Sequence, residues 1–179
     1  GQTLAKTPDI LISSIGCCVG ISAIAIVSWV YGGKEGLVIV APSMGAAAVL
    51  VYAFPHAPMS QPWPLFMGNI IGAIVGVCCQ LWVTNIVLAS GLAVGIAMAI
   101  MHLCRCVHPP GGASALAVVI GGEQLRDLGF DYVLFPVLLN CCILFITAVI
   151  VNAIFPWRRY PLAFRQYHPL EVIDNRGLT

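Results

Sequence analysis

The feature that most constrains this chain is a long stretch with almost no charge. Between Glu35 and Glu123 lie 87 residues, and Arg105 is the only Asp, Glu, Lys or Arg among them. In the whole chain 8% of the residues are charged, whereas globular proteins have about a quarter. Because such a stretch cannot face water, the sequence predicts an all-α protein, a polytopic bundle of membrane helices in one domain.

The composition also limits the partners. A net charge of +1 without clustered Lys or Arg excludes a nucleic-acid-binding protein. The expected partner along most of the surface is the lipid bilayer. Basic segments stay on the cytoplasmic side of a membrane. The tail from Arg158 onward is basic and loop 121–131 is acidic, so we expect both termini on the cytoplasmic or stromal face.

About 20 apolar residues are needed for one helical crossing, and this length divides the chain into four to six hydrophobic segments. The expected spans are 10–31, 37–54, 65–89, 92–107 and 132–155, with a short apolar segment at 113–120. The apolar run 65–107 is too long for one crossing and must fold back, with Ser90-Gly91 as the expected hairpin. Prolines in loop 55–64 prevent a helix from continuing there.

An internal repeat organises these segments. Residues 42–49, PSMGAAAV, match residues 109–116, PPGGASAL. Domain 1–160 then contains two pseudo-repeats, about 10–89 and 91–156, each with a helix broken by Pro or Gly, and a polar tail follows at 161–179. If the broken segments cross the membrane, the halves are inverted; if they are re-entrant, the halves are parallel. We favour inverted halves, and chance similarity of small-residue helices is the alternative.

Broken helices in a membrane indicate a binding function. The N-terminus of a helix carries unsatisfied N–H groups and a partial positive charge, which suit an anion. Both breaks place Pro, then Ser or Gly, ahead of an Ala-rich helix. The candidate anion-binding residues are those in or beside the two breaks: Ser43, Gly45, His56, Arg105, His108, Gly111, Gly112 and Ser114.

The sequence allows two interpretations of Arg105. A charge in the hydrophobic middle costs a few kcal/mol, so an arginine kept there indicates an anion as its partner. Alternatively, Arg105 lies at the membrane edge and extends its guanidinium into water, because His108 and two prolines follow within one turn. The sequence leaves both readings open.

The string His102-x-Cys104-x-Cys106-x-His108 resembles a set of metal ligands. Alternate residues on a helix point about 200° apart, so the four cannot converge without local unwinding. Three Cys-Cys pairs elsewhere show that this chain uses Cys freely as a small membrane residue. We therefore expect no metal, no cofactor and no catalytic residue, and the chain is not expected to be an enzyme.

Glycines recur at one-turn spacing at Gly68, Gly72 and Gly76. Such a stripe lets two helix backbones touch. The contact lies either within the bundle or between copies of the chain, and a homo-oligomer through this stripe is therefore a possible partner arrangement.

Three motifs in order resemble those of the HPP family of integral membrane proteins. The sequence His108-Pro109-Pro110 continues as GGASA, and residues 41–46 (APSMGA) and 54–62 (FPHAPMSQP) are similar to the family's other two signatures. The resemblance covers roughly residues 8 to 160. It implies a compact protein with four or five membrane helices, in a bacterial inner membrane or a chloroplast envelope. Members of cyanobacteria and chloroplast envelopes are implicated in nitrite transport.

Taken together, these features favour a transporter or channel for a small inorganic anion, with nitrite first. A cation carrier usually needs Asp or Glu at mid-membrane, and the uncharged stretch has none. Two alternatives remain. One is an intramembrane metal or redox enzyme that uses the His and Cys residues, and the other is a membrane scaffold that binds partner helices.

Overall fold

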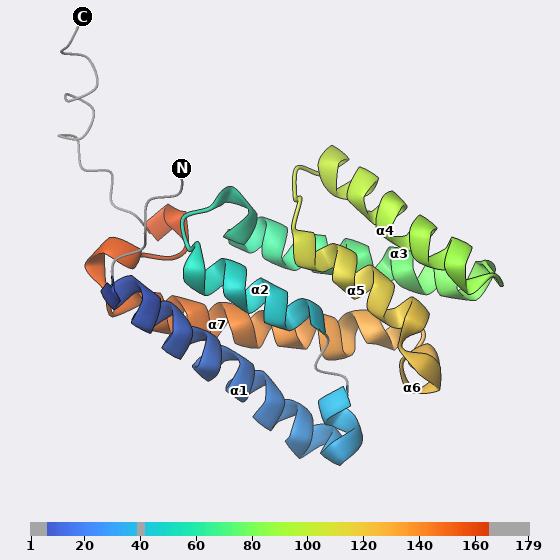
Figure 1. Ribbon diagram of the computed structural model, residues 1–179, viewed down its shortest axis with the longest axis horizontal. Helices are drawn as coiled ribbons and strands as arrows, with labels where there is room; N and C mark the ends of the chain where they lie inside the picture. The colour runs from blue at the N-terminus through green and yellow to red at the C-terminus, as the bar shows by residue number, and fades with distance from the viewer. Residues whose placement is uncertain (1–6, 39–41, 165–179) are drawn as a thin grey trace, which may run out of the picture.

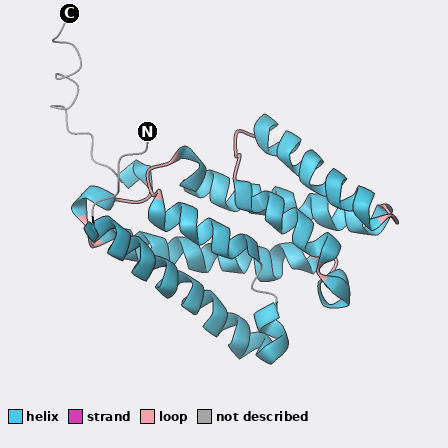
Figure 2. Ribbon diagram, in the orientation of Figure 1, coloured by secondary structure: helices cyan, strands magenta, loops and turns pink. Residues whose placement is uncertain are grey.

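The computed structural model describes residues 7–38 and 42–164, and every regular element in these ranges is a helix (Figure 2). Four helices are long and apolar enough to cross a membrane. They are Thr7–Val30, Pro64–Trp82, Ile86–Leu103 and Val133–Ala153. The expected all-α polytopic bundle is therefore confirmed.

The bundle is built from long helices and two short ones. The long helices are α1 (Thr7–Val38), α3 (Asn69–Trp82), α4 (Ile86–Leu103) and α7 (Leu139–Ala153), and the short ones are α2 (Pro42–Ala53) and α5 (Pro109–Ile120). A π-helical turn precedes both α3 (Pro64–Gly68) and α7 (Val133–Leu138). The short α6 (Gly122–Arg126) and single 3-10 turns complete the described chain.

The two halves of the bundle run in opposite directions. Figure 1 shows α1, α2 and α3 alternating in direction, and α4, α5 and α7 repeating this order with every helix reversed. The short helices α2 and α5 are in contact, and each starts near the middle of the bundle and runs outward (Figure 1). The third helix of each half crosses over: α3 packs against α4 and α5, and α7 packs against α1 and α2. This arrangement is that of inverted, interlocked repeats.

The hairpin between α3 and α4 lies at residues 83–85, and the expected position at Ser90-Gly91 is wrong. Asn85 makes this turn, because its side-chain oxygen accepts hydrogen bonds of 3.0 Å from the N–H groups of Val87 and Leu88 and so caps α4. Ser90 stays helical and donates to the carbonyl of Ile86 at 2.8 Å. The first half therefore ends at Trp82, earlier than predicted.

The glycine stripe of α3 lies against α5. A Cβ at Gly72 would lie 2.0 Å from the carbonyl oxygen of Gly111, and one at Gly76 would lie 2.4 Å from that of Ala115. A Cβ at Gly68 would lie 2.5 Å from the Cβ of His108. The stripe is thus occupied by a helix of the same chain, which is the first of the two alternatives that the sequence left open, and a homo-oligomer through these glycines would have to displace α5.

Arg158, expected to begin the basic segment on the cytoplasmic face, is buried at the end where α1, α2 and α7 meet. Its guanidinium forms an ion pair with Asp9 at 3.1 Å and donates to Asn152 and Ser13 at 3.2 Å each. It also donates to the carbonyl of Tyr52 at the end of α2. These bonds pair the charge with protein groups and join three helices.

Gly72→Ala is expected to destabilise the protein by about 2–3 kcal/mol, because the added methyl group must push α3 away from the backbone of α5. Gly91→Ala is the matched control, since a Cβ there meets nothing within 4 Å. It should leave stability unchanged or raise it by less than about 1 kcal/mol. Thermal unfolding in detergent measures both changes, and equal midpoints for the two variants would contradict the close contact.

Arg158→Met is expected to cost about 3 kcal/mol, because it removes the ion-pair partner of Asp9 and the charged donor to the buried oxygens of Asn152 and Tyr52. Arg159→Met, which changes the exposed neighbouring arginine, should cost almost nothing. The comparison uses the same thermal unfolding measurement. A loss of the same size in both variants would show that Arg158 acts only through net charge.

Candidate functional site

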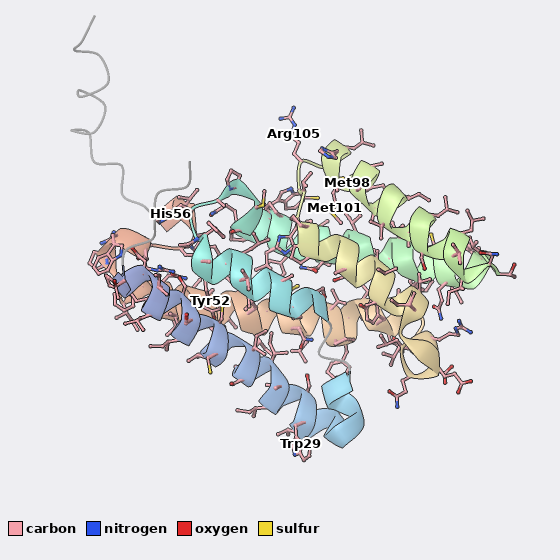
Figure 3. The ribbon with its side chains drawn as sticks, viewed as in Figure 1. Trp29, Tyr52, His56, Met98, Met101 and Arg105 are labelled. Atoms are coloured by element: carbon pink, nitrogen blue, oxygen red, sulfur yellow. The ribbon has the colours of Figure 1, made fainter. Side chains whose placement is uncertain are left out.

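A small cavity lies where α5 begins, between this helix and the end of α4. Its volume is about 130 Å³. Figure 3 shows Met98 and Met101, which come from α4, in the space between the two helices. The full lining consists of Val94, Met98, Met101, Val107, His108, Pro109 and Gly112. The cavity is therefore apolar apart from one imidazole.

His108 is the residue that caps α5, and its side chain is fully buried. Its Nδ1 lies 2.8 Å from the carbonyl oxygen of Met59, in the Pro-rich loop after α2. A carbonyl can only accept a hydrogen bond, so this geometry assigns the hydrogen to Nδ1 and leaves a lone pair on Nε2. Nε2 is itself buried and has no hydrogen-bond partner among the described residues.

Burial also decides the charge of His108, which lies in the linker between α4 and α5 and outside the four candidate spans. Desolvation lowers the pKa of His108 to about 4, against the smaller, opposite effect of the Met59 carbonyl. The imidazole is therefore neutral near pH 7.

The start of α5 offers fewer N–H groups than the sequence pattern implied. Pro109 and Pro110 occupy the first two positions and have no N–H, and the N–H of Gly111 donates to the carbonyl of His108 at 2.8 Å. The helix dipole still makes this end positive. Of the four N–H groups that a helix start normally leaves free, two are therefore absent and that of Gly111 is already used.

The two glycines of this break have different surroundings. Gly111 is packed against the carbonyl of Gly68 and the methyl group of Met101, so its lack of a side chain serves helix packing. Gly112 lines the cavity, and a Cβ there would meet only Val94, at 3.7 Å. Of the two glycines, only Gly112 therefore has space beside its backbone, and its role toward a ligand stays a prediction.

Ser114 belongs to a buried polar network. Its hydroxyl donates to the amide oxygen of Asn69 at 2.7 Å, and the amide nitrogen of Asn69 donates to the carbonyl of Leu65 at 2.8 Å. The Tyr132 hydroxyl donates to the carbonyl of Ser114 at 3.1 Å. Ser114 thus connects α5 to α3 and to the segment before α7, and its hydroxyl hydrogen is already used.

The break before α2 has a different character. Ser43 is fully buried in the first turn of α2, and its hydroxyl has no hydrogen-bond partner among the described residues. Both amide atoms of Asn140, on the neighbouring α7, are also buried and unpartnered within the same ranges. Gly45 faces outward, with nothing within 4 Å of a Cβ. Buried polar atoms of this kind call for a ligand or water.

Asn140 was not among the candidate site residues. It can be found by comparing the two halves. In both halves a π-helical turn that contains Pro precedes the last long helix, and a buried Asn follows: Asn69 in α3 and Asn140 in α7. Met98 and Met101 were missed because apolar residues on an apolar helix carry no distinguishing pattern.

Arg105 and His56 lie outside the cavity. Arg105 is exposed, and Figure 3 shows it projecting away from the helices. It ends α4 in a Schellman motif, in which the N–H of Arg105 donates to His102 O at 3.1 Å and that of Cys106 donates to Met101 O at 2.9 Å. The φ angle of Arg105 is +52°, a position usually held by glycine. His56 is exposed in the Pro-rich loop.

The His and Cys string does not converge. His102 and Cys104 are exposed, whereas Cys106 and His108 are buried. In residues 7–38 and 42–164 there is no group of three or more His, Cys, Asp or Glu side chains with the geometry of a metal site.

A second cavity, of about 340 Å³, lies at the other end of α3 and α5. Gln80, Thr84 and Arg126 contribute its polar side chains, and both amide atoms of Gln80 are buried without a partner in the described chain. Hydropathy alone does not reveal this site.

Thermal stability is expected to fall as the pH decreases from about 6.5 to 4, because the unfolded chain then binds a proton at His108 that the folded chain excludes. The full effect of this residue is about 3 kcal/mol. His108→Asn can still donate to the Met59 carbonyl but does not titrate in this range, so its stability should decline less. Unfolding midpoints measured at several pH values test this, and parallel curves for the two proteins would contradict it.

Comparisons with known proteins agree with this architecture. The chain matches the model of the HPP family, transmembrane region, over residues 2–161. Two transmembrane proteins of Dictyostelium discoideum are 33% and 36% identical to it over 80% of this chain. The matches cover 51% and 47% of those relatives, so the chain spans about half of their length. No solved structure matches it. The resemblance seen in the three motifs is thus confirmed, and the chain belongs to the HPP family of integral membrane proteins.

Proposed function

We propose that this chain is a transporter or channel for a small inorganic anion, with nitrite as the first candidate. The observation that carries the proposal is His108, a fully buried imidazole whose unpartnered Nε2 accompanies an apolar cavity at the positive end of α5. A volume of about 130 Å³ corresponds to roughly four water molecules, so the cavity suits a solute of a few atoms.

The distribution of charge supports an anion. No Asp or Glu lines the cavity, and Asp9, at the start of α1, is already paired with Arg158. A cation without a carboxylate partner would be poorly stabilised in these surroundings. In this proposal the protein binds and releases its solute unchanged, and it has no catalytic residue.

Arg105 contributes from outside the cavity. A non-glycine residue in the left-handed region costs about 1–2 kcal/mol, and this strain indicates that the side chain has a use that glycine would not serve. An exposed guanidinium attracts anions from solution and raises their rate of arrival. We infer that Arg105, which follows the cavity-lining Met101 by four residues, concentrates the anion at the membrane surface.

The orientation in the membrane completes the proposal. The start of α1 and the end of α7 lie at the same end of the bundle (Figure 1). With the basic residues of the C-terminal segment, this supports the placement of both ends on the cytoplasmic or stromal face.

Purified protein in liposomes is expected to move nitrite faster than empty vesicles do. Arg105→Gly should lower the initial rate several-fold at low ionic strength and much less at high ionic strength, because salt screens an exposed charge. The same variant should be more stable by about 1 kcal/mol, since glycine relieves the backbone strain.

Arg159→Gln, which removes an exposed arginine without strain, is the matched control and should keep the nitrite rate. Nitrite rates equal to those of empty vesicles would refute the proposed function. A slower but less stable Arg105→Gly protein would mean that Arg105 acts on folding instead.

A further inference from the structure

We propose, building on the proposed function, that an anion occupies the His108 cavity only together with a proton taken up at Nε2 of His108. The cargo of the site is then an anion and a proton, and each binding event adds no net charge to the cavity.

The first step of the argument is the hydrogen bond to Met59. It uses the only hydrogen of the neutral imidazole, on Nδ1, and leaves Nε2 as an acceptor. A lone pair repels an anion, so the neutral ring has nothing to offer nitrite. After protonation, Nε2 becomes a charged donor while Nδ1 keeps its bond to the carbonyl.

The second step is the absence of other donors around the cavity. Apart from His108, the described lining consists of Val94, Met98, Met101, Val107, Pro109 and Gly112, whose side chains donate no hydrogen bond. The first two positions of α5 are prolines, and the Gly111 N–H is bonded to the carbonyl of His108. An anion in this cavity therefore depends on His108 as a donor.

The third step concerns the charges near His108. The elements packed against it are α3 with its preceding π-helical turn, through Gly68 of that turn, the loop of Met59, and the end of α4 across the cavity. Their titratable or charged groups are His56 in the loop, His102, Cys104, Arg105 and Cys106 at the end of α4, and Cys78 and Cys79 on α3; α5 has none. No carboxylate is present on these elements, so the negative charge that stabilises an imidazolium must come from the anion.

The proton balance is simple. Neutral His108, one proton from water and one nitrite ion give an imidazolium whose Nε2–H donates to a nitrite oxygen, and release reverses both steps. No covalent bond of nitrite changes. Burying the two charges as a hydrogen-bonded pair costs far less than burying either alone. Burial lowers the pKa of His108 to about 4 in spite of the Met59 hydrogen bond, so the ring remains neutral until the anion arrives.

Titration calorimetry with sodium nitrite, in two buffers of different ionisation enthalpy at pH 7, measures the protons taken up for each nitrite bound. We expect about one proton per nitrite for the unaltered protein. His108→Asn, which retains a donor toward Met59 and has nothing at the Nε2 position, should bind nitrite at least tenfold more weakly. Thermal unfolding of this variant at pH 7 establishes that it is folded. His108→Gln places an amide near the Nε2 position and should bind some nitrite without proton uptake.

Two results separate this inference from the proposed function. Saturable nitrite binding without proton uptake would overturn proton coupling and leave the anion function standing. No nitrite binding, together with no flux above that of empty liposomes, would refute the anion function itself. If Cu(I) binds in a 1:1 ratio instead, and Met98→Leu abolishes this binding, the lone pair and the thioethers serve a soft metal and the inference is wrong.

Discussion

The contact between the glycine stripe of α3 and the backbone of α5 is the constraint on which the candidate site depends. Gly72 faces the carbonyl of Gly111 so closely that no side chain fits between them, and Gly68 lies directly on the Cβ of His108. In a membrane, where lipid tails are as apolar as the helices, such close packing is a main source of helix association. It also holds the imidazole at a fixed place, within reach of the Met59 carbonyl.

Two short helices that start inside the bundle create the surroundings of the site. Helices α2 and α5 each have 12 residues, or about 18 Å, so neither helix by itself crosses the hydrocarbon layer without the segment that precedes it. Irregular backbone survives in a membrane only where protein or a cavity surrounds it, and here α3, α4 and α7 provide the cover. The prolines that end the preceding segments have no N–H group. Because these donors are missing, hydrogen bonding at the start of α5 depends on the side chain of His108.

The two halves have the same fold, but their buried polar groups differ. In the half built around α5, Asn69 is satisfied by the hydroxyl of Ser114. In the repeat alignment Ser114 corresponds to Ala47 of α2, which has no hydroxyl, and the amide of Asn140 has no partner in the described chain. The bundle is therefore asymmetric where it is polar. One break has a hydrogen-bonded network and a histidine, and the other has buried polar atoms without partners in the described chain.

The sequence by itself determined the membrane location, the all-helical class, the repeat and both broken helices, because these follow from local properties: missing charges, apolar lengths and the positions of proline. It also named His108 as a candidate site residue, which stays a prediction. Only the tertiary structure decided that the turn before α4 lies at Asn85, that Arg158 is buried, and that the glycine stripe binds α5 of the same chain. These outcomes, like the hydrogen bond from His108 to the Met59 carbonyl, depend on groups that are far apart in the sequence and meet only in the folded chain. No local sequence pattern specifies which of these groups will meet.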